Sequence, residues 1–175
     1  GGKARGRRIK SPKAGFTRPL LSRVRKSLFD IIGDGIKGGS FLDLYAGSGA
    51  IGIEALSRGA KKTVFVEKSL LCVRTIRENL ILCGFISRAS IWQKDVLDFL
   101  PLLLEREKFD FIFIAPPYYK ELQDRTLNII EGRDINKAMV IAQHSPQEEI
   151  NLTRSNIEVV KQKRYGNTIL TFLRR

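Results

Sequence analysis

Short apolar runs with strand character alternate with helical stretches along most of this chain. The runs lie at 41–45, 63–67, 89–93, 109–114 and 138–142, and the helical stretches lie at about 49–58, 69–83, 95–107 and 120–132. Strands that read as continuous apolar runs are typical of a parallel sheet covered by helices on both faces. The alternation therefore predicts an α/β fold, in which ligands bind at the carboxyl ends of the strands.

The two ends of the chain depart from this alternation. Near the start, apolar residues recur at three- and four-residue steps over 21–31, which predicts a helix that Gly33 stops. Near the end, the strand-like runs 157–165 and 168–173 are joined by Gly166-Asn167, a pair typical of tight turns. We therefore expect an antiparallel hairpin at the edge of the sheet.

The first strand runs into a glycine-rich turn, DLYAGSGAIG at 43–52. Gly47, Gly49 and Gly52 fit the pattern G-x-G-x-x-G, and Glu67 closes the next strand twenty positions after Gly47. A carboxylate at that place is suited to bind ribose hydroxyls. Strand, glycine turn, helix, strand and terminal acid together indicate a nucleoside cofactor.

Asp43 discriminates between two cofactor classes. A dinucleotide brings a doubly charged pyrophosphate to the glycine turn, and a carboxylate four residues before the first glycine would oppose it by ~1 kcal/mol or more. S-Adenosylmethionine instead brings an ammonium and a sulfonium group, which Asp43 would attract directly or through water. The sequence therefore favours S-adenosylmethionine over a nicotinamide dinucleotide.

Asp95 follows the third strand in WQKDVLDF, directly before Val96. Its carboxylate is placed to accept a hydrogen bond from an adenine amino group. It is equally placed to cap the helix that starts at Val96, since aspartate is a preferred N-cap residue. The two roles are compatible, and both stay open at this point.

The fourth strand ends in Ala115, Pro116, Pro117 and Tyr118. Two prolines fix two φ angles and remove two N–H groups, which leaves carbonyl oxygens pointing in set directions. Such acceptors suit an amine, and the Tyr118 ring offers a face for a base to stack on, worth ~1–3 kcal/mol. We therefore predict that these four residues form the catalytic part of the site.

Basic residues dominate the charge of the chain. Lys and Arg outnumber Asp and Glu by 31 to 18, which gives a formal net charge of +13. Residues 1–29 hold ten basic side chains and no acidic one. Such a distribution favours a nucleic acid partner, although a basic soluble protein without one remains an alternative. We expect a weakly ordered basic arm at 1–15 before a single domain at 16–175. The predicted RNA-binding residues are Arg5, Arg7, Arg8, Lys10 and Arg23.

No apolar run is suited to a signal peptide or a membrane span, so we expect a cytoplasmic protein. Cys72 and Cys83 stand eleven apart in a helical pattern and fit small core residues. His144 is the single histidine, and no ligand spacing for a metal ion is present, so we expect no metal.

Several stretches together resemble one bacterial enzyme family. They are TRPLLSRVRKSLFDII, FLDLYAGSGAIGIEALSRGA, FVEK, RENL and PPY, with a basic GKARGRRI start and a closing RYGNTILTFL. This set is similar to the RsmD-type methyltransferases, which methylate a guanine N2 amine in small-subunit (16S) ribosomal RNA. The resemblance extends over nearly the whole chain, and DLYAGSGAIGIEALSRGA is its most specific part.

The resemblance implies a Rossmann-like class I methyltransferase domain with a mostly parallel seven-stranded sheet. It also implies S-adenosylmethionine as the methyl donor, no metal, and an RNA substrate within an assembled or assembling small subunit. We expect a monomer. The residues that it assigns to the donor site are Thr17, Arg18, Asp43, Tyr45, Ala46, Gly47, Gly49, Glu67, Lys68, Asp95 and Val96.

The chain departs from the family pattern at Ala115. The resemblance implies Asp, or Asn in relatives, before Pro-Pro-aromatic, where the side-chain oxygen accepts a hydrogen bond from the target amine. Our hypothesis is an active but slower enzyme in which the Pro116 carbonyl is the acceptor, unless another acid reaches the amine. Alternatives are an adenine-N6 or DNA amino methyltransferase, a nicotinamide oxidoreductase, and a catalytically impaired RNA-binding assembly factor.

Overall fold

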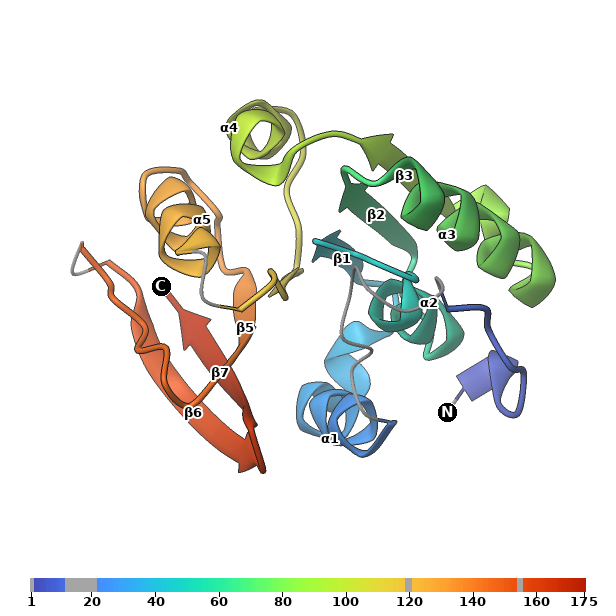
Figure 1. The fold of residues 1–175 in the computed structure, drawn as a ribbon, viewed down its shortest axis with the longest axis horizontal. Helices are drawn as coiled ribbons and strands as arrows, with labels where there is room; N and C mark the ends of the chain where they lie inside the picture. Colours follow the sequence, from blue (N-terminus) through green and yellow to red (C-terminus); the bar gives the residue numbers. More distant parts are fainter. Residues whose placement is uncertain (1, 12–21, 119–120, 154–155) are drawn as a thin grey trace.

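A computed structural model describes residues 2–11, 22–118, 121–153 and 156–175 of the chain. Its described strands form one seven-stranded sheet in the order β3-β2-β1-β4-β5-β7-β6 (Figure 1). The strands β1 to β5 pair in parallel, and β7 runs antiparallel to both β5 and β6. The strands are β1 (Ser40–Leu44), β2 (Lys62–Glu67), β3 (Ala89–Gln93), β4 (Phe111–Ile114), β5 (Met139–His144), β6 (Glu158–Tyr165) and β7 (Thr168–Arg174).

Helices cover both faces of this sheet, as the continuous apolar runs predicted. Figure 1 shows α4 and α5 on one side of the sheet and α1 and α2 on the other. Successive strand residues alternate between the faces, so that Phe113 packs with α1, α2 and α3 while Ile114 packs with α4 and α5. The α/β class and the parallel sheet are therefore confirmed. The helices are α1 (Ser22–Ile32), α2 (Ala50–Ser57), α3 (Leu70–Cys83), α4 (Val96–Arg106) and α5 (Leu122–Glu131).

The predicted C-terminal hairpin is confirmed. Strands β6 and β7 pair up to Tyr165 and Thr168 around the Gly166-Asn167 turn. Gly166 has a φ of 58°, a left-handed conformation that costs glycine little. Because β7 pairs with β5, the hairpin closes one edge of the sheet and brings its turn toward the carboxyl end of β5.

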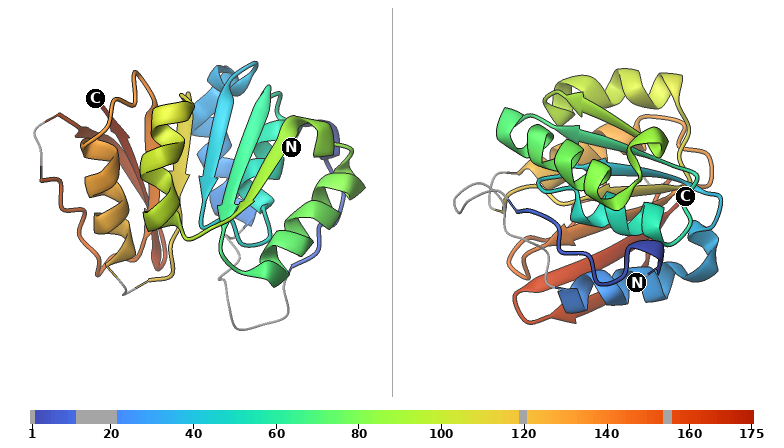
Figure 2. Two further views of the ribbon diagram at one scale, coloured as in Figure 1. Left: turned by 90° about the horizontal axis from the view of Figure 1, so that it is seen from above. Right: turned by 90° about the vertical axis from the view of Figure 1, so that its right-hand side faces the viewer.

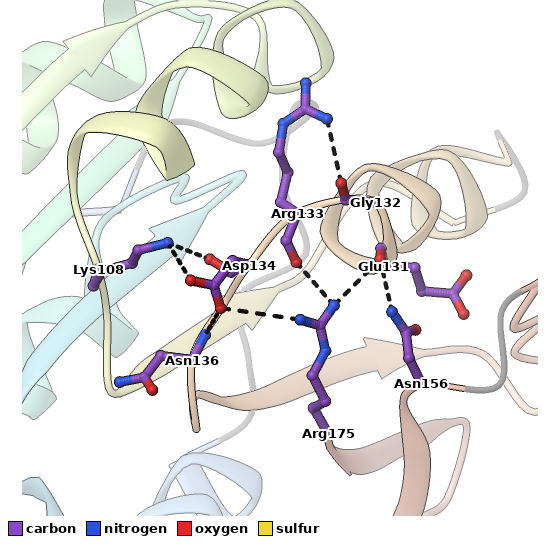
Figure 3. A network of polar contacts seen from close by, with 8 residues as sticks. All are labelled: Lys108, Glu131, Gly132, Arg133, Asp134, Asn136, Asn156 and Arg175. Atoms are coloured by element: carbon purple, nitrogen blue, oxygen red, sulfur yellow. Dashed lines mark hydrogen bonds and ion pairs between the residues drawn. The ribbon is translucent and has the colours of Figure 1, made fainter.

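Polar contacts tie the C-terminus to the amino ends of β4 and β5 (Figure 3). The Arg175 guanidinium donates to the carbonyl oxygens of Glu131, at 3.3 Å, and Arg133, at 2.9 Å, just where α5 ends. The Lys108 ammonium group lies 3.2 Å from a carboxylate oxygen of Asp134. A cation at a helix C-terminus satisfies carbonyl groups that have no partner within the helix. This network lies away from the carboxyl ends of the strands, where the ligand site is expected.

Residues 2–11 lie against α2 and α3 (Figure 2). The Ala4 N–H donates to Ser57 Oγ at 2.8 Å. The Lys10 N–H donates to Asn79 Oδ1 at 2.7 Å, and Asn79 Nδ2 donates back to the Lys10 carbonyl at 2.9 Å. Ala4 and Ile9 also pack against the hydrophobic core. This part of the expected arm is therefore attached to the domain. The charge density of the arm predicted repulsion between its basic side chains. The hydrogen bonds between the Lys10 main chain and the fully buried Asn79 side chain offset that repulsion.

Candidate cofactor and substrate site

A cavity of about 620 Å³ opens at the carboxyl ends of the central strands. Residues that directly follow β1, β2, β3 and β4 line its walls, so strands that are far apart in sequence contribute to one space. This is the place where open α/β sheets bind ligands. The predicted site residues that line it are Asp43, Tyr45, Ala46, Gly47, Glu67, Lys68, Asp95, Val96, Ala115, Pro116, Pro117 and Tyr118.

The glycine turn shapes the floor of the cavity. Gly47 and Gly49 have φ angles of 57° and 75°, which are left-handed and favour glycine. Gly49 does not line the cavity; it stands at the N-cap of α2, and a Cβ added there would lie 3.1 Å from Ile76 Cγ1. Gly47 therefore meets the cavity, whereas Gly49 allows the close packing of the turn behind it.

Glu67 holds the glycine turn from the next strand. The side chain is 8% exposed; Oε2 accepts from the Gly47 N–H at 2.9 Å and Oε1 accepts from the Ser69 N–H at 2.8 Å. Each carboxylate oxygen can accept more than one hydrogen bond. The geometry therefore fixes the carboxylate at the wall of the cavity and leaves it able to accept from ribose hydroxyls.

Asp43 is buried under the same turn. It is 2% exposed, and Oδ2 accepts a hydrogen bond from the Gly52 N–H in the first turn of α2 at 2.9 Å. Burial raises the pKa of Asp43 to about 8, with a smaller rise from the Glu67 charge, while the Gly52 N–H opposes the shift. The carboxyl group therefore binds a proton near neutral pH, and a cation in the cavity would favour its ionised form.

Asp95 caps α4, which confirms one of its two expected roles. Oδ1 accepts from the Leu97 N–H at 3.0 Å, and Oδ2 lies 3.5 Å from Lys68 Nζ. Both Asp95 and the neighbouring Val96 line the cavity. The cap fixes the carboxylate at the cavity wall, and its role toward an adenine amino group stays a prediction.

The Ala115–Tyr118 segment follows β4 on one side of β1, whereas Glu67 ends β2 on the other side, and both line the cavity. The Tyr118 hydroxyl accepts from Gln143 Nε2 at 3.2 Å and lies 3.3 Å from Thr168 Oγ1. Contacts from strands β5 and β7 thus fix the position of the Tyr118 ring. Ala115 contributes no polar side-chain atom to this wall.

Sequence reasoning missed several cavity residues. Among them are Ser11, Ser69, Lys94, Gln143, Gln147 and Asn167. Gln143 carried a usable signal, because it directly follows the apolar run 138–142 at a strand's carboxyl end. The others come from loops or from the hairpin turn, whose approach to the cavity depends on long-range packing.

The predicted RNA-binding residues Arg5, Arg7, Arg8, Lys10 and Arg23 are exposed. Two of them also make contacts within the chain: the Arg7 guanidinium donates to the Leu82 carbonyl, and Lys10 Nζ lies 2.8 Å from Glu78 Oε2. The predicted donor-site residues Thr17 and Arg18 lie outside the described residues. Within the described ranges, no helix has the length and apolar character to cross a membrane. No cluster of three metal-ligating side chains is present there either.

A family model described as "Conserved hypothetical protein 95" matches residues 1–174. This chain belongs to that family. Two relatives show how far the similarity extends along the chain. YlbH of Bacillus subtilis, named a putative rRNA methyltransferase, is 32% identical over 170 residues, which cover 95% of this chain and 92% of YlbH. Ribosomal RNA small subunit methyltransferase D of Haemophilus influenzae is 29% identical over 165 residues, or 93% of this chain and 85% of the relative. The RsmD-type resemblance is therefore confirmed.

Solved structures confirm the Rossmann-like class I methyltransferase fold. A hypothetical protein from Thermus thermophilus superposes with a TM-score of 0.84 at 32% identity, covering 100% of this chain and 97% of that one. An RNA methyltransferase from Salinibacter ruber, solved with S-adenosyl-L-homocysteine, has a TM-score of 0.69 at 13% identity, covering 89% and 92%. The second likeness shows the fold alone.

Proposed function

We propose that this chain transfers a methyl group from S-adenosylmethionine to the exocyclic N2 amine of a guanine in small-subunit ribosomal RNA. The observation that carries the proposal is the shared cavity in which buried Asp43, fixed Glu67 and the Pro116–Tyr118 step meet. The similarity to a relative named ribosomal RNA small subunit methyltransferase D supports RNA as the substrate class.

The residues of the chain divide the work between donor and acceptor. Asp43 attracts the cationic methionine portion, Glu67 accepts from the ribose hydroxyls, and Asp95 accepts from the adenine amino group. The guanine stacks on Tyr118 after it leaves its own stack. The amine nitrogen attacks the donor methyl carbon in line, and the C–S bond breaks with its electron pair on sulfur. The methylated amine then loses a proton to water, so positioning supplies most of the acceleration.

Ala115 favours a second candidate, a catalytically impaired RNA-binding assembly factor. A missing hydrogen bond to the amine costs ~1–3 kcal/mol in the transition state, which slows transfer without removing the positioning contribution. An amino methyltransferase acting on adenine N6 or on DNA would use the same donor site. A nicotinamide oxidoreductase is disfavoured, because Asp43 places an acidic group beside the glycine turn where a pyrophosphate would bind.

The test is transfer of labelled methyl from S-adenosylmethionine to small ribosomal subunits that lack native methylation. Nucleoside digestion and mass spectrometry then identify the modified base. We expect label on the exocyclic amine of guanosine. Label on adenosine would move the substrate to the N6 alternative, and donor and subunit binding without any transfer would support the assembly factor.

Donor affinity is expected to rise with pH up to about 8 because of Asp43. Below that pH the free enzyme carries a proton on Asp43, which must be released when a cationic donor binds. Each unit of rising pH lowers the free energy of that release, so donor affinity increases by up to about tenfold per unit. Above the pKa the carboxylate is already ionised and the rise ends. Glu67, Lys68 and Asp95 lie along the same cavity.

The matched variant is Asp43→Asn, which keeps an oxygen for the Gly52 N–H and cannot ionise. Titration calorimetry from about pH 6 to 9, a range that brackets the raised pKa, should give a ratio of wild-type to variant affinity that grows with pH. Dividing by the variant's value at each pH cancels the titration of the donor's own amine. A constant ratio would contradict a proton on Asp43.

Arg5, Arg7 and Arg8 are expected to bind RNA phosphates. Replacing all three with glutamine should reduce the magnitude of the log–log salt slope of RNA binding by about 2–3, since each lost phosphate contact removes about 0.7–0.9. Arg106 on α4, Lys137 before β5 and Lys161 on β6 are exposed and lie outside α2 and α3, against which the arm packs, so they provide a control triple. An equal change in both triples would mean that net charge alone attracts the RNA.

A further inference from the structure

Strand register brings Gln143 beside Ala115, where the family pattern carries an acidic or amide side chain. Strands β4 and β5 run parallel with Ile114 paired to Ala142; Gln143 is the next residue of β5, and Ala115 directly follows the end of β4. Side chains alternate along a strand, and Phe113 and Ile141 share the core cluster on one face. Ala115 packs against the same cluster. Ala115 and Gln143 therefore lie on one face, at the carboxyl ends of neighbouring strands that are spaced about 4.8 Å apart.

The Gln143 amide is held in one orientation. The residue is 7% exposed, and its Nε2 donates to the Tyr118 hydroxyl at 3.2 Å. Within the described part of the chain, Oε1 accepts no hydrogen bond. It is also not one of the buried polar atoms that lack a partner, so the oxygen is accessible to solvent. Because Gln143 lines the cavity, this oxygen opens into it.

Other polar side chains at this wall are less suited to accept a hydrogen bond from a substrate. The oxygen Oε1 of Gln147 already accepts from the Ser145 hydroxyl. Asn167 is exposed in the hairpin turn. Gln143 combines burial, a fixed amide and an available oxygen beside the segment expected to hold the target base.

We propose that Gln143 Oε1 accepts a hydrogen bond from the target amine and so supplies the acceptor that Ala115 lacks. This inference rests on the proposed function. As the amine nitrogen attacks the methyl group it gains positive charge, its N–H groups become stronger donors, and the bond to Oε1 strengthens in the transition state. The small Ala115 side chain leaves room for the longer glutamine.

The same amide links the acceptor to the stacking ring. Its nitrogen positions the Tyr118 hydroxyl while its oxygen faces the cavity, so one side chain sets the distance between the base plane and the acceptor. A role through Tyr118 alone would predict the same loss of activity when Gln143 is replaced. The experiment therefore has to separate the two.

The test is a double-mutant cycle with methyl transfer to unmethylated small ribosomal subunits as the readout. Gln143→Leu keeps a similar volume and removes the acceptor, and it should lower kcat by about 10- to 100-fold with donor affinity unchanged. In an Ala115→Asn background, which restores an oxygen on the neighbouring strand, the same replacement should cost much less. Gln143→Asn withdraws the oxygen by one methylene and should show the same pattern if the leucine variant does not fold.

Thr168→Val is the control, because it removes the Thr168 hydroxyl that lies near the Tyr118 OH and leaves Gln143 Oε1 in place. Ala115→Asn should not relieve its effect. Equal losses from Gln143→Leu in both backgrounds would overturn the proposal and assign Gln143 to positioning Tyr118. Unchanged kcat in both Gln143 variants would also overturn it, as would activity only with Ala115→Asn. Absence of transfer by wild type and by Ala115→Asn, with donor bound, would instead overturn the proposed function and this inference with it.

Discussion

Replacing Gly52 with alanine is expected to lower the free energy of unfolding by about 2 kcal/mol or more. A Cβ at this position would lie 2.3 Å from Phe65 Cε1 and 2.8 Å from Thr63 Cγ2. Both side chains are fully buried on β2, so neither can turn into solvent. Overpacking of this kind outweighs the gain of about 1 kcal/mol that alanine brings to a helix. Denaturant unfolding of wild type and variant measures the difference.

Gly35→Ala is the matched control. A Cβ at Gly35 would have Phe111 Cζ as its nearest neighbour, at 3.6 Å, which is ordinary contact. We expect its unfolding free energy to stay within about 0.5 kcal/mol of wild type. If α2 shifts to accommodate the added methyl group of Gly52→Ala, the N–H of that residue moves away from Asp43 and donor affinity falls as well. Identical unfolding midpoints for Gly52→Ala and wild type would show that Phe65 yields at little cost.

Much of the fold could be predicted because its signals are local. The apolar runs and the Gly166-Asn167 turn determine strands within a few residues of their observed ends. The contact of the third glycine, Gly52, with the Phe65 ring was not predicted, because it depends on how α2 packs against β2. The carboxyl-edge rule then brought Asp43, Glu67 and the prolines to one cavity without any knowledge of their contacts.

The roles of individual site residues depend on distant partners and could not be predicted in the same way. The sequence places Asp43 beside a glycine turn, but the burial that raises its pKa comes from packing against neighbouring elements. It gives the arm a high charge, but not the pairing of Lys10 with Asn79, 69 positions away. It also gives no indication that a glutamine on β5 faces Ala115, because that depends on strand order and register.

Tyr118→Ala is expected to lower kcat/KM for the RNA by about 10- to 100-fold, with a much smaller change in donor affinity. The ring offers the stacking face for the flipped base, and one such contact is worth about 1–3 kcal/mol. The hydroxyl contacts with Gln143 and Thr168 fix the ring but do not themselves supply that face. Single-turnover methyl transfer and donor titration on the same preparations separate the two effects.

Tyr118→Phe separates the face of the ring from its anchoring. Phenylalanine keeps the stacking surface and removes the hydroxyl that Gln143 and Thr168 hold, so its loss should be several-fold smaller than that of alanine. The phenylalanine variant loses the contacts from β5 and β7 that position the ring, and it keeps the surface on which the base stacks. Equal losses of RNA turnover and donor affinity in Tyr118→Ala would place the ring at the donor end of the cavity. Equal losses in the two variants would assign the effect to the hydroxyl.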